Sequence, residues 1–145
     1  MGYLQLKVRF SQTDITYYET PCFWSGETSM IQHPAVLTTE AGWIRGKEVV
    51  KVNFDASIVS VEKLDNYALD QGFFLIEEDG SYQKDKNPQY YLKNSIYSFL
   101  PLNYTQRSFL NYAIPYQKEF MAYLSPAQLE MLRLIQSKKT FGEEL

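Results

Sequence analysis

The single cysteine of this chain, Cys22, is the residue whose type and position most clearly allow chemistry. It follows Pro21 and lies between a segment with strand character and a segment with helix character. Backbone N–H groups at a helix N-terminus stabilise a thiolate, which is the reactive form of cysteine. The position therefore favours a nucleophilic thiol, whereas the competing interpretation is a buried cysteine that only packs.

Other kinds of site find little support in the sequence. The only histidine, His33, lies at the far end of the helix expected to start after Cys22, so we expect a surface histidine and not a Cys–His pair. No group of histidine, cysteine and carboxylate residues has metal-ligand spacing, and no glycine-rich phosphate loop is present. We therefore expect no metal and no bound cofactor.

The elements that would position Cys22 alternate between strands and helices. Strand patterns cover residues 4–10, 15–19, 36–43, 48–54, 73–76 and 90–99. Helix patterns cover residues 23–32, 61–71, 105–113 and 125–138, with Ser60, Thr105 and Ser125 as expected caps. Residues 77–88 read as a loop. This order predicts one domain, residues 1–145, with an α+β fold: a two-layer sandwich of a mixed sheet with helices packed on one face.

Composition narrows the class of protein. The chain has 145 residues and a formal net charge of −3, without a basic face suited to nucleic acid. No apolar run is long enough to cross a bilayer, and the first residues lack a secretory pattern. A single cysteine cannot form an internal disulfide. We expect a cytoplasmic protein that binds neither nucleic acid nor membrane.

The segment around Cys22 has a more specific pattern, P-C-F-W-S-G-E over residues 21–27. It resembles the G-C-F-W-x-x-E nucleophile motif of the A-type peptide methionine sulfoxide reductases. Later segments resemble further motifs of that family in the same order: 34–36, 37–46, 47–55, 58–64, 85–90 and 95–97. The resemblance covers about residues 13–110 and leaves 111–145 as a helical C-terminal extension. It implies the ferredoxin-like form of the two-layer sandwich.

The resemblance also implies roles for the residues around the thiol. Cys22 would attack the sulfur of a methionine sulfoxide and become a sulfenic acid. Phe23 and Trp24 would form the apolar wall that holds the S-methyl group of the substrate. Core packing is an equally good interpretation of Phe23 taken alone.

Three further positions match family residues that act on the sulfoxide oxygen. Glu48 would protonate this oxygen, a task that suits a carboxylic acid whose pKa burial has raised. Tyr90 would donate a hydrogen bond to it, and Asp85 would hold a water or orient the site. Without the motif, Glu48 would read as a surface strand residue and Tyr90 as one of 12 tyrosines. Glu27 is expected to support the helix or an ion pair and not to react.

The chain also departs from the family pattern. Pro21 replaces a glycine, Trp43 stands where a tyrosine is usual, and the longer loop expected between Gly46 and Glu48 is absent, which removes an oxygen-binding donor. No resolving cysteine follows Cys22. Turnover would therefore need an external thiol reductant: thioredoxin, glutaredoxin or a small thiol.

Three functions remain open at this stage. The first is a reductase of methionine S-sulfoxide, free or in proteins, that repairs oxidative damage. The second is a divergent thiol peroxidase or thiol–disulfide enzyme on the same fold. The third is a non-catalytic module that binds a ligand on its aromatic-rich sheet. The first two need a reactive Cys22 and the third does not, so titration of the thiol separates them.

Overall fold

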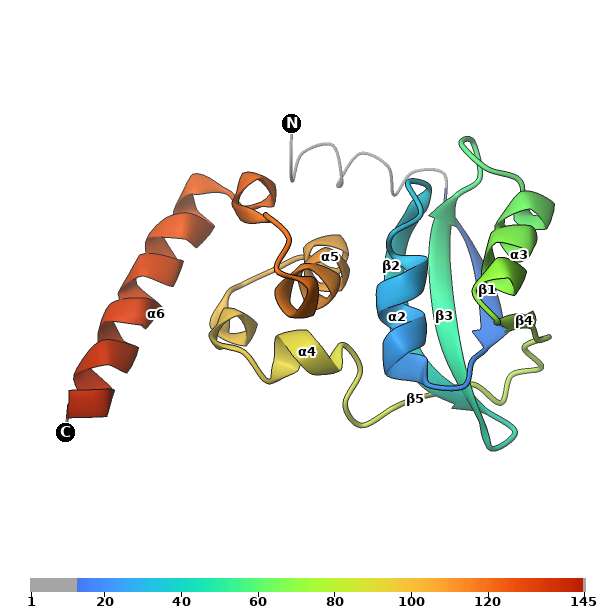
Figure 1. Cartoon of the computed structure of the whole chain (residues 1–145), viewed down its shortest axis with the longest axis horizontal. Helices are drawn as coiled ribbons and strands as arrows, with labels where there is room; N and C mark the ends of the chain where they lie inside the picture. Colours follow the sequence, from blue (N-terminus) through green and yellow to red (C-terminus); the bar gives the residue numbers. More distant parts are fainter. Residues whose placement is uncertain (1–12, 145) are drawn as a thin grey trace.

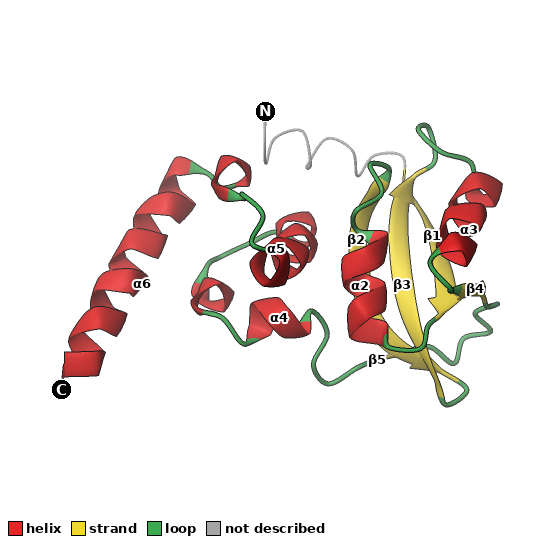
Figure 2. Ribbon diagram, viewed as in Figure 1, coloured by secondary structure: helices red, strands yellow, loops and turns green. Residues whose placement is uncertain are grey.

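The computed structural model describes residues 13–144 and has an α+β fold (Figures 1 and 2). The strand predicted for residues 4–10 lies outside the described residues. In chain order the elements are β1 (Thr13–Glu19), α2 (Phe23–Met30), β2 (Val36–Ile44), β3 (Lys47–Asp55), α3 (Val61–Asp70), β4 (Phe74–Leu75), β5 (Gln83–Lys84), α4 (Tyr90–Lys93), the 3-10 helix η2 (Ile96–Phe99), α5 (Tyr104–Tyr116), the 3-10 helix η3 (Met121–Tyr123) and α6 (Pro126–Glu144). We call residues 13–89 the sheet region and residues 90–144 the helical region.

The five strands form one sheet in the order β4-β1-β3-β2-β5, and every pairing is antiparallel. The expectation of a mixed sheet was therefore wrong. Strands β2 and β3 are joined by a two-residue turn at Arg45 and Gly46, whose φ angles of 49° and 77° are both positive. Such a turn imposes antiparallel pairing. Strand β1 then pairs with the other edge of β3 in the opposite direction.

Helices α2 and α3 both pack against one face of this sheet, as the sequence predicted (Figure 1). Their buried side chains Met30, Leu64 and Ala68 share a core with Val50 and Phe54 of β3. The hydroxyl of Tyr67 on α3 donates to the backbone oxygen of Ser29 on α2 at 3.2 Å, which ties the two helices together. Ser60 caps α3 as expected, accepting from the backbone N–H of Lys63.

Residues 90–99 form the short helices α4 and η2 and not the strand that the sequence predicted. Leu92, Ile96 and Leu100 recur every fourth residue, a helical spacing, and all three belong to the second core. The side-chain oxygen of Asn111 accepts from the backbone N–H groups of Tyr91 (2.9 Å) and Leu92 (3.1 Å). This partner for the first turn of α4 comes from a distant helix, so local propensity did not decide the outcome.

The helical region has its own core, which includes Leu92, Leu110, Ala113 and Leu132. Helix α5 begins after Asn103, which forms a capping box with Gln106, and not after Thr105 as predicted.

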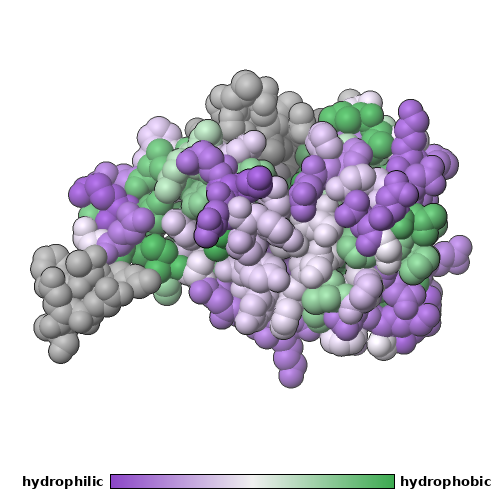
Figure 3. Space-filling model, viewed as in Figure 1, coloured by the Kyte–Doolittle hydropathy of each residue, from purple (hydrophilic) through white to green (hydrophobic). Residues whose placement is uncertain are grey.

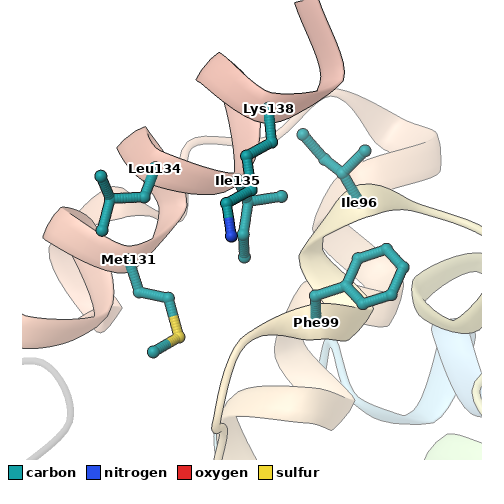
Figure 4. A pocket seen from close by; sticks show the side chains of 6 residues that line it. All are labelled: Ile96, Phe99, Met131, Leu134, Ile135 and Lys138. Atoms are coloured by element: carbon teal, nitrogen blue, oxygen red, sulfur yellow. The ribbon is translucent and has the colours of Figure 1, made fainter. Parts of the chain in front are cut away.

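Helix α6 begins with the predicted capping box. The side chain of Ser125 accepts from the N–H of Gln128, and the Gln128 side chain accepts from the N–H of Ser125. One side of α6 forms an open apolar groove against η2, and apolar surface gathers there in the space-filling view (Figures 3 and 4). The groove is lined by Ile96, Phe99, Met131, Leu134, Ile135 and Lys138. Among the described residues, no helix combines the length and apolar character that crossing a membrane requires.

Candidate functional site

Cys22 is the N-cap residue of α2, between the end of β1 and the first helical turn. Its backbone is extended (φ −145°), its thiol makes no capping hydrogen bond, and its side chain is half-buried. The helix approaches the sheet closely here, because a Cβ atom on Gly26 would lie only 2.8 Å from Cγ2 of Thr20. The predicted placement of Cys22 at a helix start is therefore confirmed.

Glu48 lies next to this helix start. Its Oε1 atom accepts a hydrogen bond from the backbone N–H of Phe23 at 3.3 Å, one residue beyond Cys22. The backbone of the same strand also holds the preceding segment, since the Thr20 N–H donates to the Glu48 carbonyl at 2.9 Å. The carboxylate is half-buried. The structure thus brings Cys22 and Glu48 together from β3 and the start of α2.

Aromatic rings form a wall beside the same helix start. The Phe23 ring makes an edge contact with Trp43 (centroids 5.0 Å apart) and a tilted contact with Trp24 (5.8 Å). Trp24 stacks on Tyr90 at 4.2 Å. We call Phe23, Trp24, Trp43 and Tyr90 the aromatic wall. Three of its members were predicted site residues, and Trp43 was noted only as a departure from the family pattern.

The register of the β2–β3 hairpin explains the position of Trp43. Trp43 is the direct cross-strand partner of Glu48, so both side chains leave the same face of the sheet. This pairing follows from a tight turn at residues 45 and 46. A hairpin drawn from the sequence would therefore have placed Trp43 at the site.

Asp85 acts on the wall through hydrogen bonds. Its Oδ1 atom accepts from Trp43 Nε1 (3.0 Å), and its Oδ2 atom accepts from the backbone N–H of Asn87 (3.0 Å). The carbonyl oxygen of Asn87 in turn accepts from Trp24 Nε1 (3.1 Å). One carboxylate therefore fixes the loop 85–89 and, through it, both indole rings. This arrangement agrees with the orienting part of the role expected for Asp85.

A buried carboxylate, Glu27, lies behind the site. Its oxygens accept from the backbone N–H of Ala41 (2.9 Å) and from that of Gln89 (2.8 and 3.0 Å). Burial raises the pKa of Glu27 to about 8, against the opposing effect of these backbone donors. Glu27 joins α2 to β2 and to the residue before Tyr90. It forms no ion pair with any described residue, so that part of the expectation was wrong.

Tyr91 is a neighbour of the thiol that the sequence did not indicate. Its ring meets the Tyr90 ring edge-on at 5.5 Å. Burial raises the pKa of its hydroxyl, and negative charge on Cys22 acts in the same direction. The sequence carried no signal for Tyr91, because residues 90–99 were expected to alternate as a strand.

His33 lies beyond the opposite end of α2 from Cys22 and has a structural role. Its Nδ1 atom accepts from the N–H of Ala35 at 3.0 Å, and its ring packs edge-on against Tyr67. Burial lowers the pKa of His33. Among the side chains described, those of residues 13–138, no three His, Cys, Asp or Glu lie close enough together to hold a metal ion.

Comparison with known proteins does not assign the chain to a family. No protein-family model matches the chain, and no curated protein is significantly similar to it. The functional argument therefore depends on the site itself.

Proposed function

We propose that this chain is a thiol-dependent reductase of methionine S-sulfoxide, free or in proteins, that acts through a sulfenic acid on Cys22. The observation that carries the proposal is the aromatic wall next to a helix-start cysteine and a carboxylate. Cys22 and Phe23 are neighbours in sequence, and the Phe23 N–H binds Glu48. In support of the proposal, a thiol, a carboxyl group and an apolar surface lie beside one helix start.

In this reaction the Cys22 thiolate attacks the sulfoxide sulfur while Glu48 transfers a proton to the sulfoxide oxygen. The oxygen passes to Cys22, which becomes a sulfenic acid, and methionine leaves with its sulfur reduced. Tyr90 would donate a hydrogen bond to the oxygen during the transfer. Asp85 is a positioning residue, because its two oxygens hold Trp43 and the loop that holds Trp24.

The aromatic wall favours this substrate over the other thiol chemistries considered. Aromatic rings bind methyl and sulfur groups through dispersion and sulfur–aromatic contacts. A hydrogen peroxide molecule has no apolar group for such a wall to hold. A binding module that does not use its cysteine would have no need of a half-buried thiol at a helix N-terminus beside Glu48.

The proposal also includes a particular form of the fold and a location in the cell. The connection β1-α2-β2-β3-α3-β4 with the strand order β4-β1-β3-β2 supports a ferredoxin-like arrangement, extended by β5 at one edge. We propose a cytoplasmic role in the repair of oxidised methionine, with an external thiol as reductant.

A direct assay tests the proposal. Incubation with methionine S-sulfoxide and dithiothreitol should release methionine continuously. Glu48→Gln should lower turnover by roughly 10²-fold at neutral pH, as expected for loss of a positioned general acid. Glu62→Gln, an exposed change of the same type on α3, is the control and should keep full turnover. No methionine release by the unmodified protein would refute the proposed function.

A further inference from the structure

A second pocket, next to the site, carries an excess of positive charge. It has a volume of about 620 Å³, and four basic residues line it: Lys84, Lys86, Lys93 and Arg107. Only one acid, Asp85, lines it as well. The whole chain has 14 basic and 17 acidic residues, so this concentration of positive charge opposes the overall balance. We call it the basic pocket.

Neutral acceptors hold two of these cations in place. Lys93 Nζ donates to the side-chain oxygen of Asn87 (2.7 Å) and to the carbonyl oxygen of Lys86 (3.2 Å). Arg107 Nε donates to Oε1 of the buried Gln89 (3.1 Å). No carboxylate of the described residues forms an ion pair with Lys86, Lys93 or Arg107. Lys93 and Arg107 are therefore held in place without a direct ion pair, as a site that binds anions requires.

The two acids near the pocket are already engaged. Asp85 uses one oxygen for Trp43 and the other for the backbone of Asn87. Lys84 approaches Glu40 at 3.9 Å, but Glu40 also accepts from the hydroxyls of Tyr82 and Tyr104. Each carboxylate keeps one negative charge, so together they offset two of the four positive charges, and the pocket retains a positive excess. An anion from outside the chain would supply the missing partner.

The loop 85–89 connects the basic pocket with the candidate active site. Asp85, Lys86 and Pro88 of this loop line the pocket. The same loop holds the aromatic wall, through Asp85 to Trp43 and through the Asn87 carbonyl to Trp24. A molecule bound in the pocket therefore contacts the segment that holds both indoles.

We propose that the basic pocket binds the carboxylates of a small acidic thiol and presents this thiol to oxidised Cys22. This inference rests on the proposed function, which needs an outside reductant because Cys22 is the only cysteine. The volume falls within the range of about 300–1,000 Å³ that is usual for small-molecule sites. Arginine and lysine side chains together suit carboxylate groups, with arginine able to bind one in a bidentate manner.

The reductive step balances with the thiol as the only co-reactant. The thiol of the small molecule loses its proton, and the thiolate attacks the sulfur of the Cys22 sulfenic acid. An S–S bond forms, the S–O bond breaks, and the departing hydroxide takes up that proton and leaves as water. A second thiol attacks the mixed disulfide, which releases Cys22 as a thiol and the small molecule as its disulfide. Two thiols are oxidised for each sulfenic acid reduced.

Binding is tested first, without any reaction at Cys22. S-methylglutathione has two carboxylates and no thiol, and NMR titration of the reduced protein should give saturable shifts in residues 84–88, 93 and 107. The double variant Lys84→Gln/Lys86→Gln should weaken binding about tenfold, since it removes two of the four cations. The control Lys63→Gln/Lys118→Gln makes the same charge change at exposed positions that do not line the pocket and should bind normally.

Reduction is tested next, on Cys22 that hydrogen peroxide has converted to the sulfenic acid. The pocket variant should react about tenfold more slowly than the unmodified protein with glutathione, which is acidic, and equally fast with 2-mercaptoethanol, which is neutral. Comparing the variant with the unmodified protein for each thiol cancels the intrinsic reactivity of the thiol. The control variant should match the unmodified protein with both.

Three outcomes would overturn the inference: no saturable binding of S-methylglutathione, equal slowing with both thiols, or displacement of S-methylglutathione by inorganic phosphate at equal concentration. Neither experiment uses methionine sulfoxide, so each stands apart from the proposed function. If the protein binds and reacts as described but releases no methionine, the inference about the basic pocket stands and the proposed reductase function is refuted. If the protein reduces methionine sulfoxide but gives neither expected result, the reductase function stands and the inference about the basic pocket is refuted.

Discussion

The sheet region and the helical region each have a core, but they differ in what they give to the site. The core of the sheet region lies between the sheet and helices α2 and α3. Both regions leave large apolar side chains on the surface, with Phe99 72% and Leu134 48% exposed in the helical region and Phe74 57% and Leu69 55% exposed in the sheet region. Cys22, Glu48 and Asp85 all belong to the sheet region.

The helical region supplies support to the site. Asn111 binds the backbone of Tyr91 and Leu92, and Arg107 binds the side chain of Gln89. Buried polar bonds also join the two regions, since the hydroxyl oxygen of Ser108 on α5 accepts from the N–H of Thr39 (3.0 Å) and from the side chain of Gln89 (3.2 Å). The sheet region therefore holds the thiol and the carboxylates, whereas the helical region contributes Tyr90 and fixes the backbone that follows it. Changes in each region should therefore have separable effects.

The largest expected effect comes from Cys22→Ser in the sheet region. It should abolish methionine release without lowering the midpoint of thermal unfolding, because the thiol is half-buried and makes no capping hydrogen bond. Methionine release and thermal unfolding are measured on the same preparation. Residual activity above a few per cent would mean that another group is the nucleophile.

The unmodified protein provides the matching positive result. Without reductant it should release one methionine per chain and then stop, and dimedone should label Cys22 only after that turnover. Sustained release without any thiol, or no dimedone adduct, would contradict a sulfenic acid intermediate.

The next largest effect should come from removing the buried carboxylate of Glu27, which lies behind the site in the sheet region. Glu27→Ala leaves the N–H groups of Ala41 and Gln89 buried without their acceptor. At about 1–3 kcal/mol for each such group, the free energy of unfolding should fall by roughly 2–6 kcal/mol, as measured by urea titration. Exposed Glu62→Ala on α3 is the control and should change it by less than about 0.5 kcal/mol. Equal stability of both variants would show that the buried contact contributes little.

The acid–base behaviour of Glu27 gives a prediction with a defined sign. Its pKa rises from 4.5 to about 8 on folding, so between these pH values the unfolded chain has lost a proton that the folded chain keeps. Stability should therefore fall as pH rises through this window and level off above it, by an amount on the order of 3–5 kcal/mol. The pH dependence of the free energy of unfolding is measured for Glu27→Gln as well. Subtracting it from that of the unmodified protein removes the contribution of the other titrating groups. A difference that rises with pH would show that the backbone donors outweigh burial.

The smallest effect is expected where the helical region is open. Phe99→Ser should change the free energy of unfolding by less than about 0.5 kcal/mol, because the ring is mostly exposed. Leu110→Ala in the same region removes a fully buried side chain and should cost about 2–5 kcal/mol. Urea unfolding measures both. A large loss for Phe99→Ser would show that the ring contributes to the second core.

Sequence patterns predicted the sheet region well because its signals are local. Alternation along β3 and the cap at Ser60 each depend on neighbouring residues, and the bounds of the predicted strands and helices agree to within one or two residues. The short strand β5 was missed, because residues 77–88 were expected to form a loop. Residues 90–99 were mistaken because four aromatic residues there favour a strand, whereas the partner that completes α4 is Asn111, about 20 residues away. Patterns in a short stretch of sequence cannot predict a partner that lies so far along the chain.

The candidate site was predicted in part for the same reason. The motif around Cys22 and the strand of Glu48 indicated residues that do lie together, although their catalytic roles stay predictions. Trp43 follows from the hairpin register and was within reach of the sequence. The hydrogen bonds of Asp85 and the burial of Glu27 depend on how the loop 85–89 folds back over the sheet, which no local pattern specifies.

The bond between Glu27 and Gln89 also has a consequence for synthesis on the ribosome, because it joins residues 62 positions apart. At about 5–20 residues per second, Gln89 is made roughly 3–12 s after Glu27. During that interval the nascent chain contains the Glu27 carboxylate but not the Gln89 N–H group that donates to it. We expect α2 to dock firmly only when the loop has emerged, so the helix that carries the only thiol is among the last parts of the sheet region to become protected from solvent.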